Sequence, residues 1–241
     1  NEWKIKYPVV LTEYKHQKEF VNSYYFTEVL SKLLNEEDVI VTDMGLAYQG
    51  THQAFKVKKG QEFFSSCGLS SMGAGLPGAI GACIATNMRR TICIAGDGGL
   101  QMTIQELATV KHYNLPIKLF IYNNYGYSTI KQSQEIGFNG RLMGCDQDHG
   151  LSFPDFQKVS TAYGIESVRI STHKDLIKKV KNVLSPMKPI ICELMINPDQ
   201  IQAPRAIPKY KEDGTSEQTP IEDLYPFIGK GELRKNMIAE K

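Results

Sequence analysis

Short β-branched runs alternate along this chain with segments of helical periodicity, and this alternation restricts the fold more than any other feature. Five runs have the composition of mostly buried strands: 38–42, 91–95, 117–122, 165–170 and 190–194. Helical patterns lie between and around them, at about 18–34, 73–86, 104–113, 153–163 and 173–184. We therefore predict an α/β fold, a three-layer sandwich in which helices cover both faces of a mainly parallel sheet.

The loops after three of these strands are the first candidates for a functional site. In open α/β sheets, ligands bind outside the carboxyl ends of the strands, where loops lead into helices. The three loops contain Asp43-Met44-Gly45, Gly96-Asp97-Gly98-Gly99 and Asn123-Asn124-Tyr125-Gly126. We expect all three to open on the same edge of the sheet.

The segment 96–102 combines a carboxylate with signals for anion binding. Thr103 and Glu106 have the spacing of a capping box, which predicts a helix that begins just past Met102. A helix N-terminus and the amides of a glycine loop together favour a bound phosphate. Asp97 would repel that phosphate unless a cation lay between them, so the sequence predicts a metal ion.

The Asn123-Asn124 pair at the end of the next strand strengthens this prediction. Mg²⁺ prefers six oxygen ligands, and phosphates and water supply part of the set. Asp97, Asn124 and the carbonyl of Gly126, with two diphosphate oxygens and a water, would complete an octahedron. Twenty-four residues separate Gly98 from Asn123, enough for one helix and one strand to bring the second loop beside the first.

These motifs resemble the thiamine-diphosphate binding motif, in which GDG is followed after this interval by NN. The surrounding residues are similar to the acetolactate synthase branch of the thiamine-diphosphate enzymes. Segment 67–77 resembles the family's cofactor-cradling loop, and 123–128 its metal loop. The resemblance covers roughly residues 8–198, and the tail 204–227 is similar to that of synthase-like proteins found with surface-sugar pathways.

The resemblance implies a role for each matching residue. Asp97, Asn124 and the Gly126 carbonyl would ligate Mg²⁺, and Met102 would bend the cofactor into its reactive V shape. The residues implied in cofactor binding are Met44, Gly45, Leu46, Ala47, Ser70, Met72, Gly96, Gly98, Gly99, Met102 and Tyr127.

Within this set, the amides of Gly98 and Gly99 and the turn 44–47 would hold the diphosphate, and the backbone of Ser70 and Met72 the pyrimidine ring. Family members often carry Gln-His where Leu46-Ala47 stands. Side-chain contacts to the diphosphate are therefore in doubt at that turn.

Of the three domains typical of the family, the chain resembles only the last. The resemblance implies the cofactor-binding domain of an acetolactate synthase-like transferase or lyase that decarboxylates a 2-oxo acid, with or without carboligation. The family's glutamate that protonates the pyrimidine comes from a separate pyrimidine-binding domain, usually of a partner subunit, so we expect the chain alone to be inactive. Residues 1–17 would be a linker from a missing preceding domain, 18–197 the thiamine diphosphate and Mg²⁺ domain, and 198–241 an extended tail.

Three alternatives stay open. The chain could be a decarboxylase subunit of a split enzyme, or a non-catalytic cofactor-binding module. Residues 73–78 also satisfy GxGxxG, which would make Asp97 a ribose ligand in an NAD-binding oxidoreductase domain. Against this last alternative, Pro77 falls inside the fingerprint, 63–66 is a poor buried strand, and Asn123-Asn124 has no role.

Composition and charge indicate which partners and which cell compartment to expect. The formal charge is only +2 and basic residues are scattered, so we expect no nucleic-acid partner. No apolar stretch approaches the ~20 residues that span a bilayer, so we expect no membrane partner. Five cysteines without CxxC spacing indicate reduced core residues in a cytoplasmic protein. A site shared between domains implies a homodimer or tetramer.

Several other features have ordinary structural interpretations. We interpret 146–149 as a surface turn or N-cap region rather than a metal cluster, and 1–12 as extended. For Met102, core packing is the alternative to a role at the cofactor. We interpret His112 and His173 as structural or solvated, and His52 as a helix residue rather than a catalytic one. The residues interpreted as core are Tyr24, Tyr25, Leu30, Leu33 and Leu34.

Overall fold

The computed structural model describes residues 2–210 and 215–237. The chain divides into two compact units, residues 1–200 and 201–241. The division falls three residues after the predicted end of the binding domain at residue 197.

The first unit is built on a sheet of six parallel strands, which confirms the predicted α/β class. The strands are β1 Val39–Thr42, β2 Glu62–Ser65, β3 Thr91–Gly96, β4 Ile117–Asn123, β5 Glu166–Ile170 and β6 Ile190–Met195. Their order is β2-β1-β3-β4-β6-β5. The unpredicted strand β2 lies at one edge, where its side chains are only partly buried.

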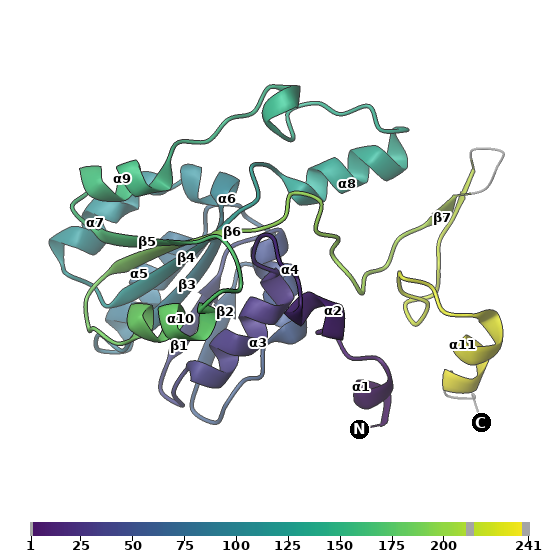
Figure 1. Ribbon diagram of the computed structural model, residues 1–241, viewed down its shortest axis with the longest axis horizontal. Coiled ribbons are helices and arrows are strands. Elements are labelled where there is room, and N and C mark those ends of the chain that lie inside the picture. Colours follow the sequence, from purple (N-terminus) through teal and green to yellow (C-terminus); the bar gives the residue numbers. More distant parts are fainter. Residues whose placement is uncertain (1, 211–214, 238–241) are drawn as a thin grey trace. The chain divides into compact units, whose positions relative to one another are not determined.

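Helices cover both faces of the sheet (Figure 1). The first face is covered by α3 (Ser23–Leu33), α4 (Leu46–Ala54) and α10 (Leu176–Leu184). The other is covered by α5 (Gly75–Ala85), α7 (Leu107–His112) and α9 (Phe156–Ala162). Successive strand residues alternate between the two cores, since Ile92 and Ile94 face the first and Cys93 and Ala95 the second.

The sheet order argues against the NAD-binding alternative. In a dinucleotide fold, the strand before the glycine fingerprint lies beside the strand that ends at the ribose-binding carboxylate. Here β2 precedes the Gly73–Gly78 segment and β3 leads to Asp97, but β1 lies between these two strands.

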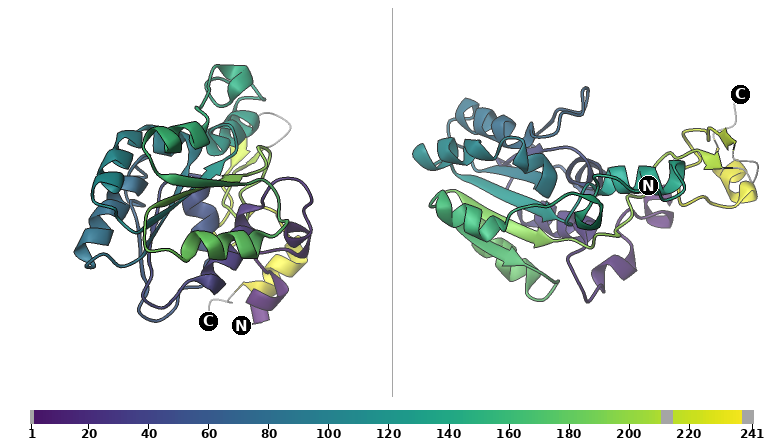
Figure 2. Two further views of the ribbon diagram at one scale, coloured as in Figure 1. Left: turned by 60° about the vertical axis from the view of Figure 1, so that its left-hand side comes forward. Right: turned by 90° about the horizontal axis from the view of Figure 1, so that it is seen from above.

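The remaining helices and turns complete the first unit. They are α1 (Glu2–Lys6), α2 (Thr12–Lys15), α6 (Asp97–Gln101), the 3₁₀ turn η1 (Ile104–Glu106), α8 (Ser128–Gly137) and the 3₁₀ turn η2 (Gln147–His149). The expected extended conformation of 1–12 is wrong over Glu2–Lys6, which is helical. Figure 2 shows the segment between α8 and α9 as a long loop that carries the short turn η2.

The first helix of the sandwich begins later than its pattern predicts. The side chain of Asn22 accepts from the N–H groups of Tyr24 and Tyr25, at 3.0 and 3.2 Å, and so caps α3. Just before it, Val21 joins the sheet, where its N–H donates to the carbonyl of Met195 at 2.8 Å. The predicted core residues Tyr24, Leu30 and Leu34 of this region are buried, with Tyr25 and Leu33 packed beside them.

The second unit has little regular structure among its described residues. It contains the antiparallel pair β7 (Lys209–Tyr210) and β8 (Ser216–Glu217) and the helix α11 (Lys230–Asn236). The ammonium of Lys209 lies 2.5 Å from Oδ2 of Asp223 and 4.2 Å from the ring centre of Phe227.

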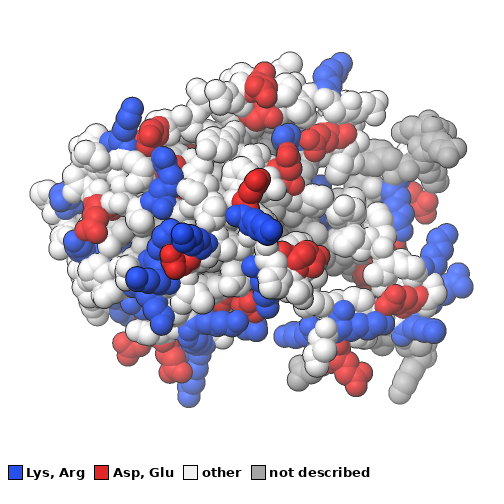
Figure 3. Space-filling view, in the orientation of Figure 1, with Lys and Arg blue, Asp and Glu red and all other residues white. Residues whose placement is uncertain are grey.

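Three further properties concern the described residues. None of their helices, the longest of which have 11 residues, is long and apolar enough to cross a membrane. Lys and Arg side chains are interspersed with Asp and Glu on the face in Figure 3. All five cysteines are free; Cys67 is exposed, contrary to the core interpretation, and the other four are buried as predicted.

Candidate functional site

The carboxyl ends of β1, β3 and β4 are neighbours in the sheet, and the loops that follow them meet as predicted. The N–H groups of Asn124 and Gly126 both donate to Oδ2 of Asp97, at 3.1 and 3.2 Å. From the first loop, Oδ1 of Asp43 accepts from the N–H of Gly73 at 2.9 Å. Segments from three strand ends and from the 66–74 loop are thus joined at one place.

Asp97 is the most strongly perturbed group at this edge. It is 1% exposed, and its Oδ1 accepts from the N–H of Gly98 at 2.7 Å. Burial raises the pKa of Asp97 to about 7, because the backbone N–H donors offset only part of the desolvation of the carboxylate. No Lys, Arg or His among the described residues forms an ion pair with it. A bound cation would therefore favour the ionised form strongly.

The side-chain amide of Asn124 lies between the carbonyl oxygen of Gly126 and Oδ2 of Asp97. In the orientation that satisfies both acceptors, its nitrogen donates to them, at 2.9 and 3.3 Å. With a cation bound here, the amide would turn over and offer its oxygen beside those of Asp97 and Gly126. A carboxylate, an amide oxygen and a carbonyl oxygen are ligands that Mg²⁺ takes, so the donor set fits Mg²⁺.

The predicted capping box at Thr103 is wrong. Helix α6 begins at Asp97, directly after β3, and Thr103 precedes η1 without capping it. The hydroxyl of Thr103 instead donates to the carbonyl of Gly73 at 2.9 Å, and the Glu106 carboxylate accepts from Thr109 at 3.1 Å. Because α6 has only five residues, the case for a cation depends on the oxygen cluster rather than on a helix dipole.

Two glycines of the GDGG segment are required by close neighbours. A Cβ at Gly98 would lie 2.0 Å from a ring carbon of Tyr127, and one at Gly99 would lie 2.3 Å from Oδ2 of Asp43. Any larger residue at either position would push apart the loops that form the site. The segment must therefore contain glycine for packing as well as for ligand access.

Met102 is 52% exposed, so the core-packing interpretation of this residue is wrong. It ends α6 beside the 66–74 loop, where a Cβ at Gly73 would lie 2.8 Å from its own Cβ. Leu100, for which the sequence offered no role, is buried in the core under α5 and α7. Nε2 of Gln101 is buried without a hydrogen-bond partner among the described residues, so a donor is available at this end of α6.

The expected pyrimidine loop is exposed and locally bonded. Ser70 has the left-handed φ of 51° and its N–H donates to the carbonyl of Ser66 at 2.9 Å. Met72 is 38% exposed. The bond from Thr103 to the carbonyl of Gly73 ties the end of this loop to the residue that follows Met102.

The turn expected at 44–47 is the start of α4. Gly45, with φ of 69°, precedes this nine-residue helix, and Leu46 and Ala47 form its first turn. The side chains of Met44, Leu46 and Ala47 are buried. Because these side chains are buried, the backbone N–H groups of the turn are the groups that could contact a diphosphate.

The polar segment after α8 is a helix cap, as interpreted from the sequence. The carboxylate of Asp146 accepts from the N–H of His149 at 3.1 Å and lies 2.5 Å from its Nδ1. Cys145 is close enough to share an ion with these two groups, since the three ligand atoms lie within 4.8 Å of one another. The cap already uses the Asp146 and His149 groups, and Lys131 lies 3.6 Å from Oδ2 of Asp146.

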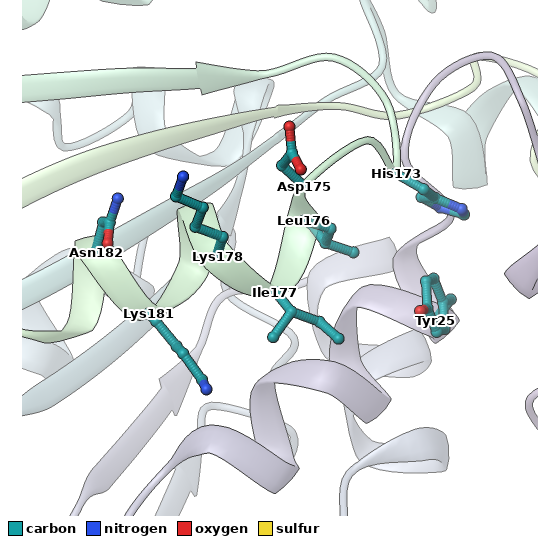
Figure 4. A pocket seen from close by; sticks show the side chains of 8 residues that line it. All are labelled: Tyr25, His173, Asp175, Leu176, Ile177, Lys178, Lys181 and Asn182. Carbon is teal, nitrogen blue, oxygen red and sulfur yellow. The ribbon is translucent and has the colours of Figure 1, made fainter.

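A separate hollow lies between α3 and α10 (Figure 4). Its His173 accepts at Nε2 from the N–H of Asn22 at 2.9 Å, and its Nδ1 lies 3.3 Å from the carbonyl of Lys15. The ring packs edge-on against Tyr25. Burial lowers the pKa of His173, so the neutral ring ties the β5–α10 loop to the N-terminal segment.

Asp43 is a residue of the site that the sequence reasoning missed. It is buried, and besides its bonds to Gly73 it lies where Gly75 and Gly99 must lack side chains. Burial raises its pKa, against the hydrogen bonds from the N–H groups of Met44, Gly73 and Gly75. The available signal was a second carboxylate directly after a buried strand.

Residues 43–194 match the model of a protein family described as thiamine pyrophosphate enzyme, C-terminal TPP binding domain. The chain is 33% identical over 241 residues to the acetolactate synthase large subunit of Cyanidium caldarium, which covers 99% of the chain and 36% of that protein. It is 34% identical over 165 residues to a probable acetolactate synthase large subunit of Methanococcus aeolicus, with 68% and 27% covered. Over 187 residues it is 29% identical to acetolactate synthase 2, chloroplastic, of Zea mays, with 76% and 29% covered. The chain thus spans about a third of the length of these relatives.

Proposed function

Because the chain belongs to the thiamine pyrophosphate enzymes and corresponds to their C-terminal binding domain, we propose that it binds thiamine diphosphate through Mg²⁺ at the carboxyl edge of its sheet. The observation that carries the metal assignment is the meeting of the Asp97 carboxylate, the Asn124 amide and the Gly126 backbone at one place. A diphosphate beside two buried carboxylates would be repelled without a divalent cation, and the oxygens of these three groups provide ligands for one.

In this proposal, the remaining residues bind different parts of the cofactor, according to where they lie. The diphosphate lies against the backbone of Gly96, Gly98 and Gly99 and the start of α4 at residues 44–47, with Tyr127 over Gly98. The backbone of Ser70 and Met72 holds the pyrimidine ring. Met102, half exposed at the end of α6, packs against the cofactor and holds it in its bent conformation.

The bound cofactor supplies a carbon nucleophile and an electron sink, which suits decarboxylation of a 2-oxo acid. This chain's residues neutralise the diphosphate and fix the cofactor's conformation. We propose that the complete protein is acetolactate synthase-like, and that a pyrimidine-binding domain of the same or a partner subunit supplies the glutamate. The names of the similar proteins from Cyanidium caldarium and Methanococcus aeolicus support the reaction class.

Calorimetry of thiamine diphosphate binding in the presence of Mg²⁺ tests the metal assignment. We expect Asp97→Ala to abolish Mg²⁺-dependent binding, because it removes the one charged protein ligand. Asp199→Ala is the matched control, since this carboxylate is exposed and outside the site. Unchanged affinity in Asp97→Ala would overturn the assignment.

A second experiment concerns catalysis. Without the pyrimidine-binding domain, we expect the 241-residue chain with cofactor and Mg²⁺ to release no CO₂ from pyruvate above background. Steady turnover would show that the chain carries its own proton-transfer group. No turnover after addition of a glutamate-bearing pyrimidine domain would favour the non-catalytic module.

We further propose that the complete protein is a homodimer or tetramer, because its active site would be shared between domains, and that it works in the cytoplasm. The five free cysteines support a reducing compartment. Analytical ultracentrifugation of the full-length protein and fractionation of cells that express it would test the two statements. A monomer with full activity, or recovery outside the cytoplasm, would contradict them.

A further inference from the structure

A buried hydrogen-bond network joins strand β6 to the metal turn, which we define as residues 123–126. Glu193 of β6 is 1% exposed, and its Oε1 accepts from Nδ2 of Asn123 at 2.7 Å. Its Oε2 accepts from Nε of Arg169 at 2.7 Å and from Nε2 of Gln157 at 3.2 Å. Both carboxylate oxygens therefore have donors, and one of these donors belongs to the metal turn.

Asn123 uses both ends of its amide. While Nδ2 donates to Glu193, Oδ1 accepts from the N–H of Tyr125 at 3.1 Å. Tyr125 has φ of 59°, a left-handed conformation that costs a non-glycine residue about 1 kcal/mol or more. The bond from its N–H to Asn123 helps to hold the residue in that conformation, between the two metal-turn residues whose N–H groups donate to Asp97.

We propose that Glu193 is a positioning residue for the metal ligands, an inference that rests on the proposed Mg²⁺ site. As an acceptor, it obliges Asn123 to direct its nitrogen toward β6 and its oxygen toward Tyr125. That orientation keeps the metal turn in the conformation in which the backbone of Asn124 and Gly126 is held beside Asp97. Glu193 itself contacts none of these three residues through the hydrogen bonds described.

The substitution Glu193→Gln breaks the match of donors and acceptors without changing size. If the new amide offers oxygen to Asn123, its nitrogen faces the donors of Arg169 and Gln157. If it offers nitrogen, Asn123 must turn over and present its own nitrogen to the N–H of Tyr125. The first arrangement sets donor against donor at Arg169 and Gln157, and the second costs the metal turn its hydrogen bond from Tyr125.

Exchanging the amide and the carboxylate between positions 123 and 193 restores the match of donors and acceptors. With Asn123→Asp and Glu193→Gln together, the new amide nitrogen donates to one oxygen of residue 123 and its oxygen accepts from Arg169. The other oxygen of residue 123 accepts from the N–H of Tyr125. The double variant keeps the total charge and side-chain sizes of the wild type, whereas Asn123→Asp alone places two carboxylates in contact.

Mn²⁺ binding to the 241-residue chain at saturating thiamine diphosphate, followed by electron paramagnetic resonance, provides the test. We expect Glu193→Gln and Asn123→Asp each to weaken Mn²⁺ binding at least about tenfold, as outer-shell substitutions commonly do. The double variant should return to within about threefold of the wild type. Glu166→Gln, an exposed glutamate of the neighbouring strand, is the matched control and should bind normally.

The outcomes separate this inference from the proposed function. Mn²⁺ bound by neither the wild type nor the control would overturn the proposed function. Normal Mn²⁺ affinity in Glu193→Gln, or a double variant as weak as the single ones, would overturn the positioning role while leaving the metal site intact. If a single variant fails to fold, recovery of folding and Mn²⁺ binding in the double variant supports the inference, and its failure refutes it.

Discussion

The two edges of the parallel sheet differ in whether their buried charges have partners within the protein. At the amino edge, Arg90 donates to both oxygens of Asp38, at 2.7 and 2.6 Å, just before β3 and β1 begin. The buried Lys118 near the start of β4 donates to the carbonyls of Pro186 and Lys188, at 2.5 and 2.6 Å. Each buried charge at this edge has its partners within the protein.

At the carboxyl edge, Asp43 and Asp97 are buried with backbone N–H donors, and neither forms an ion pair with a described Lys or Arg. Burial raises the pKa of both carboxyls. One edge thus contributes stability by itself, whereas we propose that a ligand cation completes the other. Apart from the pair that the buried Glu193 forms with Arg169 beside the metal turn, the fold separates its stabilising charges from its proposed binding charges by the length of a strand.

The largest expected effect is at the amino edge. Arg90→Met leaves Asp38 buried without its counter-charge, and we expect the free energy of unfolding to fall by about 3–5 kcal/mol. Urea denaturation of the ligand-free chain measures it. A loss below about 1 kcal/mol would remove the contrast between the edges.

At the carboxyl edge the expected gain appears only with ligand. Thiamine diphosphate and Mg²⁺ at about 100 times the dissociation constant should stabilise the wild type by about 2.7 kcal/mol, seen as a rise of roughly 5–10 °C in Tm. Arg90→Met should keep this increment, and Asp97→Asn should lose it. An equal rise in Asp97→Asn would place the cation elsewhere.

A smaller effect should follow from acid. Because burial lowers the pKa of His173 in the folded chain, the unfolded chain binds the proton more readily. The stability that the neutral ring provides is fully present above about pH 6.5 and is lost as pH falls through the folded pKa. His173→Gln keeps an acceptor for Asn22 but cannot titrate, so the difference in unfolding free energy between the two proteins should change with pH below about 6.5. A constant difference from pH 5 to 8 would contradict this account.

The smallest effect should come from an exposed ion pair at the amino edge. Lys188 lies 2.6 Å from Glu166, but both side chains are largely in water. Glu166→Gln should therefore change the free energy of unfolding by about 0.5 kcal/mol or less, as measured by the same urea denaturation. A loss comparable to that of Arg90→Met would mean that position in the sheet, rather than burial, decides the contribution of charge.

The buried strands and the meeting of the three loops could be predicted because they depend on local patterns. Runs such as Thr91–Gly96 are apolar and β-branched, and parallel strands bring their carboxyl ends together whatever the details. Strand β2 escaped prediction since an edge strand needs fewer buried residues. Helix α8 escaped because only Ser128 in it is buried, so its pattern lacks an apolar stripe.

The partners of the site's polar groups could not be predicted because they are distant in sequence. Thr103 fits a local capping box, yet its hydroxyl bonds Gly73, 30 residues earlier. Glu193 meets Asn123 across 70 residues, and nothing near it in the sequence indicates that contact. Proposed ligand identities followed from residue type and the family resemblance, while the residues that hold them required the three-dimensional arrangement.

The attachment of Val21 to the Met195 carbonyl has a consequence for synthesis. This backbone bond joins segments about 175 residues apart, so the ribosome must translate nearly the whole first unit before the bond can form. At about 5–20 residues per second, the segment around Val21 waits roughly 9–35 s for its partner. During that interval the apolar side of α3 lacks the cover that β6 later provides, so the nascent chain exposes apolar surface until β6 has emerged.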